Sequence, residues 1–337
     1  MNRLQHLKKT LPINIKNALA EHENTEFVLL DYHSSDGLSD WVRANMKQEI
    51  DKQILAFFQT FEPQSYHRSH SVNMVFRLAT GDILVNLDAD NFIGKGFTKW
   101  IHEKMINGSF MATEETVDEN RFKDVMGRVC VWKGDFLKVR GYDERMVGYG
   151  FDDLDFKTRL TKIGLHLIPI KKVTFLKTIK HDNWVRIKNE WILQNLHVVT
   201  VRHIEPFCSE VCLFYKNYSY EKAMIVDNFF HGKFAEKIKV IHKLNQVVIG
   251  NLTKGSWKYN QDNLQLDDKN LISTNDSSLY WFYPTNFEIV NEIIFTFSAL
   301  KNKKTYFENN KKNIAMINED GFGKGNVILN FNKIINL

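Results

Sequence analysis

The chain has 337 residues, of which 43% are hydrophobic and 25% are charged, an ordinary composition for a globular protein. Its formal net charge of +5 suits anionic small molecules or a loose hold on an anionic membrane surface, and it is too small to indicate nucleic-acid binding. No apolar run approaches the ~20 residues that span a bilayer, and no signal-peptide core is visible. Cys130, Cys208 and Cys212 do not have zinc-site spacing, which predicts inert thiols. We expect a cytoplasmic protein, free or peripheral at the inner face of the membrane.

Strands and helices alternate over the first half of the chain. Apolar spacing predicts a helix over residues 4–20, with Pro12 as a kink or break. Strands are predicted over residues 26–31, 54–61, 83–87, 128–132 and 165–170, and helices over 38–50, 69–79, 96–105 and 153–163. This alternation predicts an α/β fold with a mainly parallel sheet and helices on both faces.

The pattern weakens after residue 190. Helices are predicted over residues 190–199 and 234–248, a polar loop over 251–278, and a solvated charged stretch over 301–313. The aromatic cluster Trp281–Tyr283 could offer a sugar platform, but core packing is the favoured interpretation. We therefore expect one domain over residues 1–190 and a less regular extension over 191–337, mixed helical and irregular, that could contact an acceptor or a docking partner.

The most informative motif is a mainly apolar run, residues 83–87, that ends in two acids. On an extended chain the side chains alternate, so Asp88 and Asp90 should point the same way. Two such carboxylates repel each other unless a cation lies between them, and Mg²⁺ or Mn²⁺ typically uses one or two carboxylates together with substrate phosphates. The motif predicts an enzyme that handles a phosphorylated donor at the carboxyl edge of the sheet.

A second acidic cluster lies at residues 141–155, which hold three glycines and five acids. Gly148 and Gly150 permit a close backbone approach to a ligand, and Tyr149 between them offers a flat face for a sugar ring. Asp152 and Asp153 open a helix, where acids also complement the helix dipole. Helix capping would explain one or two of these acids, whereas a metal site plus a general base explains both clusters.

Together these motifs resemble the inverting family-2 glycosyltransferases of the GT-A fold, and most closely the branch that shares the carboxyl-terminal module of the β-1,4-galactosyltransferases. The resemblance covers about residues 2–190. It implies a GT-A, Rossmann-like domain in which Asp88 and Asp90 bind Mn²⁺ or Mg²⁺ and the donor diphosphate. It further implies that His181 supplies another metal ligand.

The donor side also resembles that family. Arg3 follows the position of the family's first strand, where an arginine approaches the nucleotide, and Asp31 matches an acid that meets the base or ribose. Arg68, with Asn73 five residues on, fits the segment that precedes the metal strand. Because Asn2 stands where the first strand has just ended, we expect the domain to lack that strand.

On the acceptor side, the resemblance implies that Asp153 is the catalytic base and Asp152 the acid before it, with acceptor contacts from Tyr149 and Gly150. Tyr149 stands where the galactosyltransferases have tryptophan, and Leu154 stands where they have a further acid. The identity of the acceptor is therefore not carried over.

The resemblance implies a hexosyltransferase that moves a hexose or N-acetylhexosamine from a UDP-sugar to a glycan or lipid-linked oligosaccharide, as in polysaccharide biosynthesis. Two alternatives stay open at this point. A nucleotidyltransferase would share the sheet and the paired aspartates, and a carbohydrate- or UDP-binding pseudo-enzyme would bind without turnover. The sequence names neither the sugar, the acceptor nor the oligomeric state.

Overall fold

The computed structural model describes residues 1–20, 24–113, 125–205, 208–226, 248–261, 263–267, 271–272 and 281–337. Backbone contacts group the chain into two units. The first unit contains residues 1–147, 151–181 and 306–337, and the second contains residues 148–150 and 182–305. The sequence predicted a single boundary between residues 190 and 191. In the structure the main part of the second unit begins earlier, at Asp182, and residues 306–337 return to the first unit.

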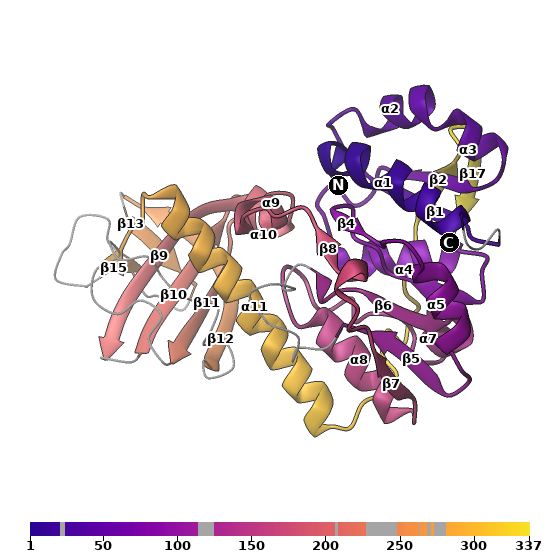
Figure 1. Ribbon diagram of the computed structural model, residues 1–337. Helices are drawn as coiled ribbons and strands as arrows, with labels where there is room; N and C mark the ends of the chain where they lie inside the picture. Colours follow the sequence, from indigo (N-terminus) through magenta and orange to yellow (C-terminus); the bar gives the residue numbers. More distant parts are fainter. Residues whose placement is uncertain are drawn as a thin grey trace. The chain divides into compact units, whose positions relative to one another are not determined.

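The first unit alternates strands and helices over most of its length (Figure 1). Its elements are α1 (Leu4–Leu19), β1 (Phe27–Tyr32), α2 (Leu38–Asn45), α3 (Lys47–Asp51), β2 (Leu55–Thr60), α4 (Arg68–Leu78), β3 (Ile83–Val85), β4 (Asn91–Phe92), α5 (Phe97–Lys104), β5 (Ser109–Ala112), β6 (Val129–Trp132), α7 (Lys133–Lys138), α8 (Asp152–Lys162), β7 (His166–Pro169), β8 (Lys177–Thr178), β16 (Asn326–Leu329) and β17 (Lys333–Asn336). The predicted helix over residues 38–50 is two helices, α2 and α3.

In the described part of the first unit there are two four-stranded sheets, with strand orders β1-β2-β16-β17 and β3-β6-β5-β7, and a two-stranded sheet of β4 and β8. β1 is parallel to β2 and β5 to β7, whereas β16 with β2, β3 with β6 and β5 with β6 are antiparallel. The arrangement is therefore mixed rather than mainly parallel, because β6 and the late strand β16 run against their neighbours. Among the described residues β1 is paired only with β2, and β3 only with β6.

Helix α1 packs on the first of these sheets through a stripe at helical spacing. The stripe is buried in one cluster with Phe57 of β2 and consists of Leu4, Leu7, Leu11 and Ile15. Pro12 lies on the exposed side, and the helix continues to Leu19 without a break. The same helix presents Asn14 and Thr10 to the segment that follows β3, so its packing also positions that segment.

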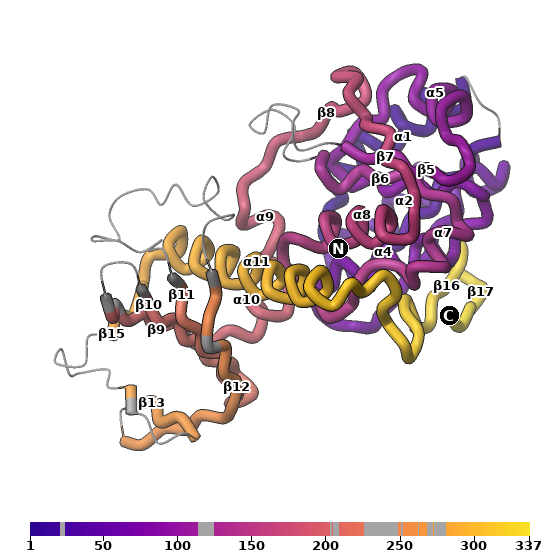
Figure 2. The backbone as a smooth tube through the Cα atoms, turned by 90° about the horizontal axis from the view of Figure 1, so that it is seen from below, coloured from indigo at the N-terminus to yellow at the C-terminus, as the bar shows by residue number. Residues whose placement is uncertain are grey.

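The described part of the second unit is built on a seven-stranded antiparallel sheet. Figure 2 traces its backbone as a tube. Its elements are α9 (Asn183–Ile187), α10 (Trp191–Asn195), β9 (Leu196–Glu205), β10 (Cys208–Tyr215), β11 (Ser219–Val226), β12 (Val248–Asn260), β13 (Asn263–Leu266), β14 (Leu271–Ile272), β15 (Trp281–Phe282) and most of α11 (Phe287–Lys311), whose last residues from Tyr306 on belong to the first unit. The strand order is β14-β13-β12-β11-β10-β9-β15. Among the described residues, no helix is both long enough and apolar enough to cross a membrane.

The sequence predictions for this unit were largely wrong. Only α10 is helical within residues 190–199, and β9 begins at Leu196. The predicted loop over residues 251–278 contains most of β12 and all of β13 and β14. These strands bury only one face, so Trp257 and Leu264 lie in the core while Lys258 is exposed. The exposed polar residues obscured the alternation of apolar and polar residues that would have indicated strands. Of the helix predicted over residues 234–248, residues 234–247 lie outside the described part of the chain.

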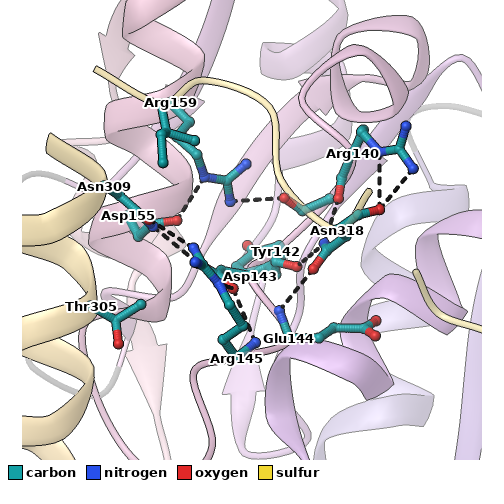
Figure 3. Close-up of polar contacts among 12 residues, drawn as sticks. Arg140, Tyr142, Asp143, Glu144, Arg145, Asp155, Arg159, Thr305, Asn309 and Asn318 are labelled. Atoms are coloured by element: carbon teal, nitrogen blue, oxygen red, sulfur yellow. Dashed lines mark hydrogen bonds and ion pairs between the residues drawn. The ribbon is translucent and has the colours of Figure 1, made fainter. Parts of the chain in front are cut away.

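The C-terminal end of α11 is held in the first unit by a buried polar network (Figure 3). Asn309, 1% exposed, donates from Nδ2 to Asp143 Oδ2 at 3.0 Å and to Asp155 Oδ1 at 2.9 Å. Its Oδ1 accepts from Arg145 Nη2 at 2.7 Å, and Arg159 Nε donates to Asp155 Oδ2 at 2.7 Å. The stretch over residues 301–313 is therefore not simply a solvated face, because one of its polar residues is a structural anchor.

Replacing Asn309 by Ala should lower the free energy of unfolding by roughly 2–3 kcal/mol, since two buried carboxylates each lose a donor. Chemical denaturation of the two proteins measures the difference. Glu308→Ala, an exposed neighbour on the same helix, is the control and should change stability little. Equal stability of the Asn309→Ala variant and the parent chain would contradict the anchoring role.

Candidate active site

Three acids from two separate parts of the chain surround Arg68, the first residue of α4. Arg68 Nη1 is 2.9 Å from Asp153 Oδ1 and forms a second ion pair with Asp152, and both acids lie in the first turn of α8. Its Nη2 is 3.8 Å from Oδ1 of Asp88, which follows β3. The fold thus brings Asp88 of the first predicted motif together with Asp152 and Asp153 of the second.

Gly127, two residues before β6, leaves the space in which these side chains meet. A β-carbon at this position would lie 2.6 Å from Arg68 Nη2, 3.1 Å from Asp153 Oδ2 and 3.2 Å from Asp88 Oδ2. The first distance is shorter than any normal contact, so a side chain here would displace the guanidinium. The backbone at Gly127 therefore forms one wall of the acidic cluster, a role that the sequence alone did not predict.

Asp90 and His181 form a separate pair beside this cluster. Asp90 Oδ2 and His181 Nε2 are 2.6 Å apart and both side chains are nearly buried. Pairing of β4 with β8, which places Asn91 opposite Thr178, brings the two segments together. Asp88 and Asp90 thus have different partners, although the sequence predicted that they point the same way.

The pair fits a divalent metal as two protein ligands. A carboxylate oxygen and an imidazole nitrogen suit Mn²⁺, which leaves further positions to substrate phosphates. Within the described residues, however, no group of three or more His, Cys, Asp or Glu side chains is arranged as a complete set of metal ligands. Asp88 faces Arg68 at 3.8 Å, so its predicted role as a metal ligand is not tested by this geometry.

A chain of hydrogen bonds that the sequence analysis missed orients Asp90. Arg128, 1% exposed, donates from Nη2 to Asn91 Oδ1 at 3.0 Å. Asn91 Nδ2 in turn donates to Asp90 Oδ1 at 2.7 Å, and the backbone oxygen of Asn91 accepts from Asn14 Nδ2 at 2.8 Å. A polar residue directly after the second aspartate and an arginine opening a buried strand were the available signals. We call Arg128, Asn91 and Asp90 the relay.

The pKa values of Asp88, Asp90 and Asp153 are shifted in different directions. For Asp90, the burial penalty is outweighed by the hydrogen bond to His181 and by the charges of His181 and Arg3, so its pKa is lowered. Partial burial raises the pKa of Asp88 against the pull of Arg68, and the charge of Asp90 adds to the rise. Partial burial also raises the pKa of Asp153, to about 7, again opposed by Arg68. Asp153 is therefore the acid best able to exchange a proton near neutral pH.

The other predicted donor residues lie near this cluster or serve the fold. Arg3 precedes α1 and is close enough to Asp90 for its charge to act on that carboxylate. Asp31, near the end of β1, accepts a hydrogen bond from the Ser34 backbone at 2.9 Å, a turn-capping contact. Asn73 is fully buried and bonds the backbone of Tyr142 on both sides, a structural role.

The predicted acceptor residues Tyr149 and Gly150 belong to the second unit. The Tyr149 ring stacks on Phe295 at 4.2 Å, and its hydroxyl accepts from Arg186 Nη1 at 2.9 Å. Gly148 before it allows close packing on α11, since a β-carbon there would lie 1.9 Å from Ser298 Oγ. The close approach observed is thus to a helix, and the contacts of Tyr149 and Gly150 with an acceptor stay a prediction.

Comparison with known families agrees with this geometry. Residues 2–113 match glycosyl transferase family 2, and residues 118–182 match the N-terminal domain of galactosyltransferase. Residues 2–113 and 118–182 thus belong to a glycosyltransferase module. The family and the GT-A-like fold predicted from the sequence are confirmed, and the glycosyltransferase carries the second unit in addition.

Two solved structures are similar in part. One is a Drosophila β-1,4-galactosyltransferase 7 mutant in complex with manganese, UDP-Gal and xylobiose, at 16% identity over 49% of this chain and 75% of that chain, with a TM-score of 0.34. The other is the catalytic domain of Drosophila β-1,4-galactosyltransferase 7 with xylobiose, at 16% identity over 50% and 75%, with a TM-score of 0.35. No curated protein matches the glycosyltransferase.

Replacing Asn91 by Ala should weaken Mn²⁺ binding to the glycosyltransferase by roughly tenfold, because a group that orients a metal ligand is typically worth that much. Arg128→Met should weaken Mn²⁺ binding by a similar factor. The double variant should bind Mn²⁺ no more weakly than either single variant, because both substitutions interrupt the same relay. Titration followed by electron paramagnetic resonance measures the affinity without turnover. Asn45→Ala, an exposed change on α2, is the control. Unchanged Mn²⁺ affinity in a folded Asn91→Ala protein would exclude the relay.

Proposed function

We propose that the protein is a metal-dependent, inverting hexosyltransferase that uses a UDP-sugar as donor and a glycan or lipid-linked oligosaccharide as acceptor. The observation that carries the proposal is the convergence of Asp88, Arg68 and Asp153 at one backbone wall, Gly127, next to the pair of Asp90 and His181. The match to the galactosyltransferase domain supports a hexose or N-acetylhexosamine as the transferred sugar.

On the donor side, this chain supplies two positive groups and a metal-ligand pair. Arg68 and Arg3 hold the diphosphate and the nucleotide, and Asp31 meets the base or ribose. Asp90 and His181, with Asp88 added, would hold Mn²⁺ or Mg²⁺, which when bound neutralises negative charge on the departing nucleotide. The relay keeps Asp90 oriented toward that task.

On the acceptor side, Asp153 accepts the proton of the attacking hydroxyl. The hydroxyl oxygen bonds to the anomeric carbon from the face opposite the nucleotide, and the bond to the diphosphate breaks in the same displacement, which inverts that carbon. One base suffices for this reaction, and no enzyme nucleophile is needed. Asp152 shares Arg68 with Asp153 and so positions the guanidinium.

Arg68 links the two halves of the reaction. It is hydrogen-bonded to Asp153 at 2.9 Å, and its charge holds the pKa of that acid down. A diphosphate that draws Arg68 toward itself would weaken this contact and strengthen Asp153 as a base. Donor binding would then prepare the acid that activates the acceptor.

The cellular setting follows from the same proposal. Polysaccharide biosynthesis at the cytoplasmic face of a membrane would supply both a nucleotide sugar and a lipid-linked acceptor, and the net charge of +5 suits peripheral attachment to anionic lipid. The two alternatives, a nucleotidyltransferase and a sugar-binding pseudo-enzyme, are outcomes of the experiments that follow.

Replacing Asp153 by Asn should reduce sugar transfer at least about a hundredfold while leaving UDP and Mn²⁺ affinity within a few-fold, because the change removes a base and keeps the shape. Release of UDP from a panel of UDP-sugars with acceptor measures the rate, and calorimetry measures binding. Asp82→Asn, an exposed change before β3, is the control. Transfer that survives in Asp153→Asn would refute the base assignment, and sugar 1-phosphate instead of UDP as the product released from the UDP-sugar would indicate a nucleotidyltransferase.

The pH dependence of transfer should follow Asp153. Burial raises its pKa to about 7, and the base must be deprotonated. The value of kcat/KM should therefore rise about tenfold per pH unit below about pH 7 and level off above it. Rates of UDP release across this range test the expectation. A profile that is flat from about pH 6 to about pH 8 would contradict it.

A further inference from the structure

Four aromatic rings gather on the sheet of the second unit, apart from every residue assigned above. Trp257 of β12 is buried, and its Nε1 donates to the Tyr215 backbone at 3.0 Å. The His197 ring of β9 stacks on Trp257 at 5.1 Å and 16°, and Tyr218 and Tyr259 contact it with centroids 5.2 Å away. Tyr218 is 60% exposed and Tyr259 is 54% exposed. We call His197, Tyr218, Trp257 and Tyr259 the aromatic platform.

The platform combines flat faces with polar edges. His197 Nε2 and the Tyr259 hydroxyl are 2.7 Å apart, which fixes both exposed rings against the buried indole. Aromatic faces pack against the C–H face of a pyranose, while hydroxyl and imidazole groups at the ring edges bond its hydroxyls. A purely aliphatic patch would offer only the first of these contacts, so the chemistry favours a sugar over an apolar partner.

Tyr218 occupies a backbone position that disfavours its side chain. It ends the tight turn between β10 and β11, where its N–H donates to the Tyr215 oxygen at 3.0 Å, and its φ is +62°. Glycine or asparagine is the usual residue in this conformation, because a β-carbon makes it unfavourable. A large, exposed ring held at such a position does not serve the turn, and this points to a role at the surface.

We propose that the aromatic platform binds a neutral oligosaccharide. The proposal rests on the proposed function only for the origin of that ligand, which would be the glycan acceptor or product of the transferase. The cluster that the sequence suggested, Trp281–Tyr283, is a weaker candidate. Trp281 lies beneath the Arg202 guanidinium at 5.0 Å and packs with Tyr283 against the core.

The test is binding of cellohexaose, maltohexaose and N-acetylchitohexaose to the full chain, measured by calorimetry without donor or metal. At least one probe should bind, and Tyr259→Ala should weaken that binding about tenfold. Tyr218→Gly is the sharper variant, because it relieves the unfavourable φ and should fold at least as stably while binding about tenfold more weakly. Phe282→Ala, an exposed aromatic of the same unit, is the matched control and should bind like the parent chain.

Three results would overturn the proposal. They are failure of all three probes to bind, binding that both tyrosine variants retain, and a Tyr218-dependent dimer in place of sugar binding. Because the assay contains neither donor nor metal, it is independent of turnover. Sugar binding without any transfer would support the aromatic platform and count against the proposed function. Transfer without sugar binding at the platform would support the proposed function and count against the platform.

Discussion

The ion pairs of Arg68 are the interaction on which the candidate active site depends. Three carboxylates crowd around one guanidinium, and they come from the end of β3 and from the start of α8, segments about sixty residues apart. Such a cluster of acids is unfavourable unless a cation neutralises it. Arg68 supplies that charge within the chain, and Gly127 supplies the room for it. Arg68 thereby holds acids of both motifs close together, at the place where the proposed reaction would bind a metal and a diphosphate.

Arg128, a buried arginine, supports the metal-ligand pair through Asn91. Burial lowers the pKa of Arg128 to about 10, so it is still charged at neutral pH. Burying a guanidinium this deeply costs free energy of desolvation. The hydrogen bond from Arg128 to Asn91 indicates its structural role, because Asn91 in turn orients the carboxylate of Asp90. The positive charges of Arg68 and Arg128 both act on Asp88 and so limit its repulsion by the neighbouring acids.

The sequence predicted the acidic residues better than their surroundings. Asp88 and Asp153 could be singled out as candidates because each follows a strong local pattern, an apolar strand or a glycine-rich helix start. Gly127 and Arg128 could not, since their importance lies in contacts with residues distant in sequence. The second unit was missed for a different reason. Its strands bury one face only, so Lys258 beside Trp257 imitates a polar loop, and the pairing of β16 with β2 joins residues that no local pattern connects.

The central claim is that the cluster around Arg68 and the pair of Asp90 and His181 form one donor site. The most direct test is UDP release with Mn²⁺ from a panel of UDP-sugars, comparing the parent chain with its Asp88→Ala variant. The account predicts metal-dependent release from one donor by the parent chain and its loss in the variant. Equal release by both proteins, or the absence of both UDP binding and release in the parent chain, would contradict it.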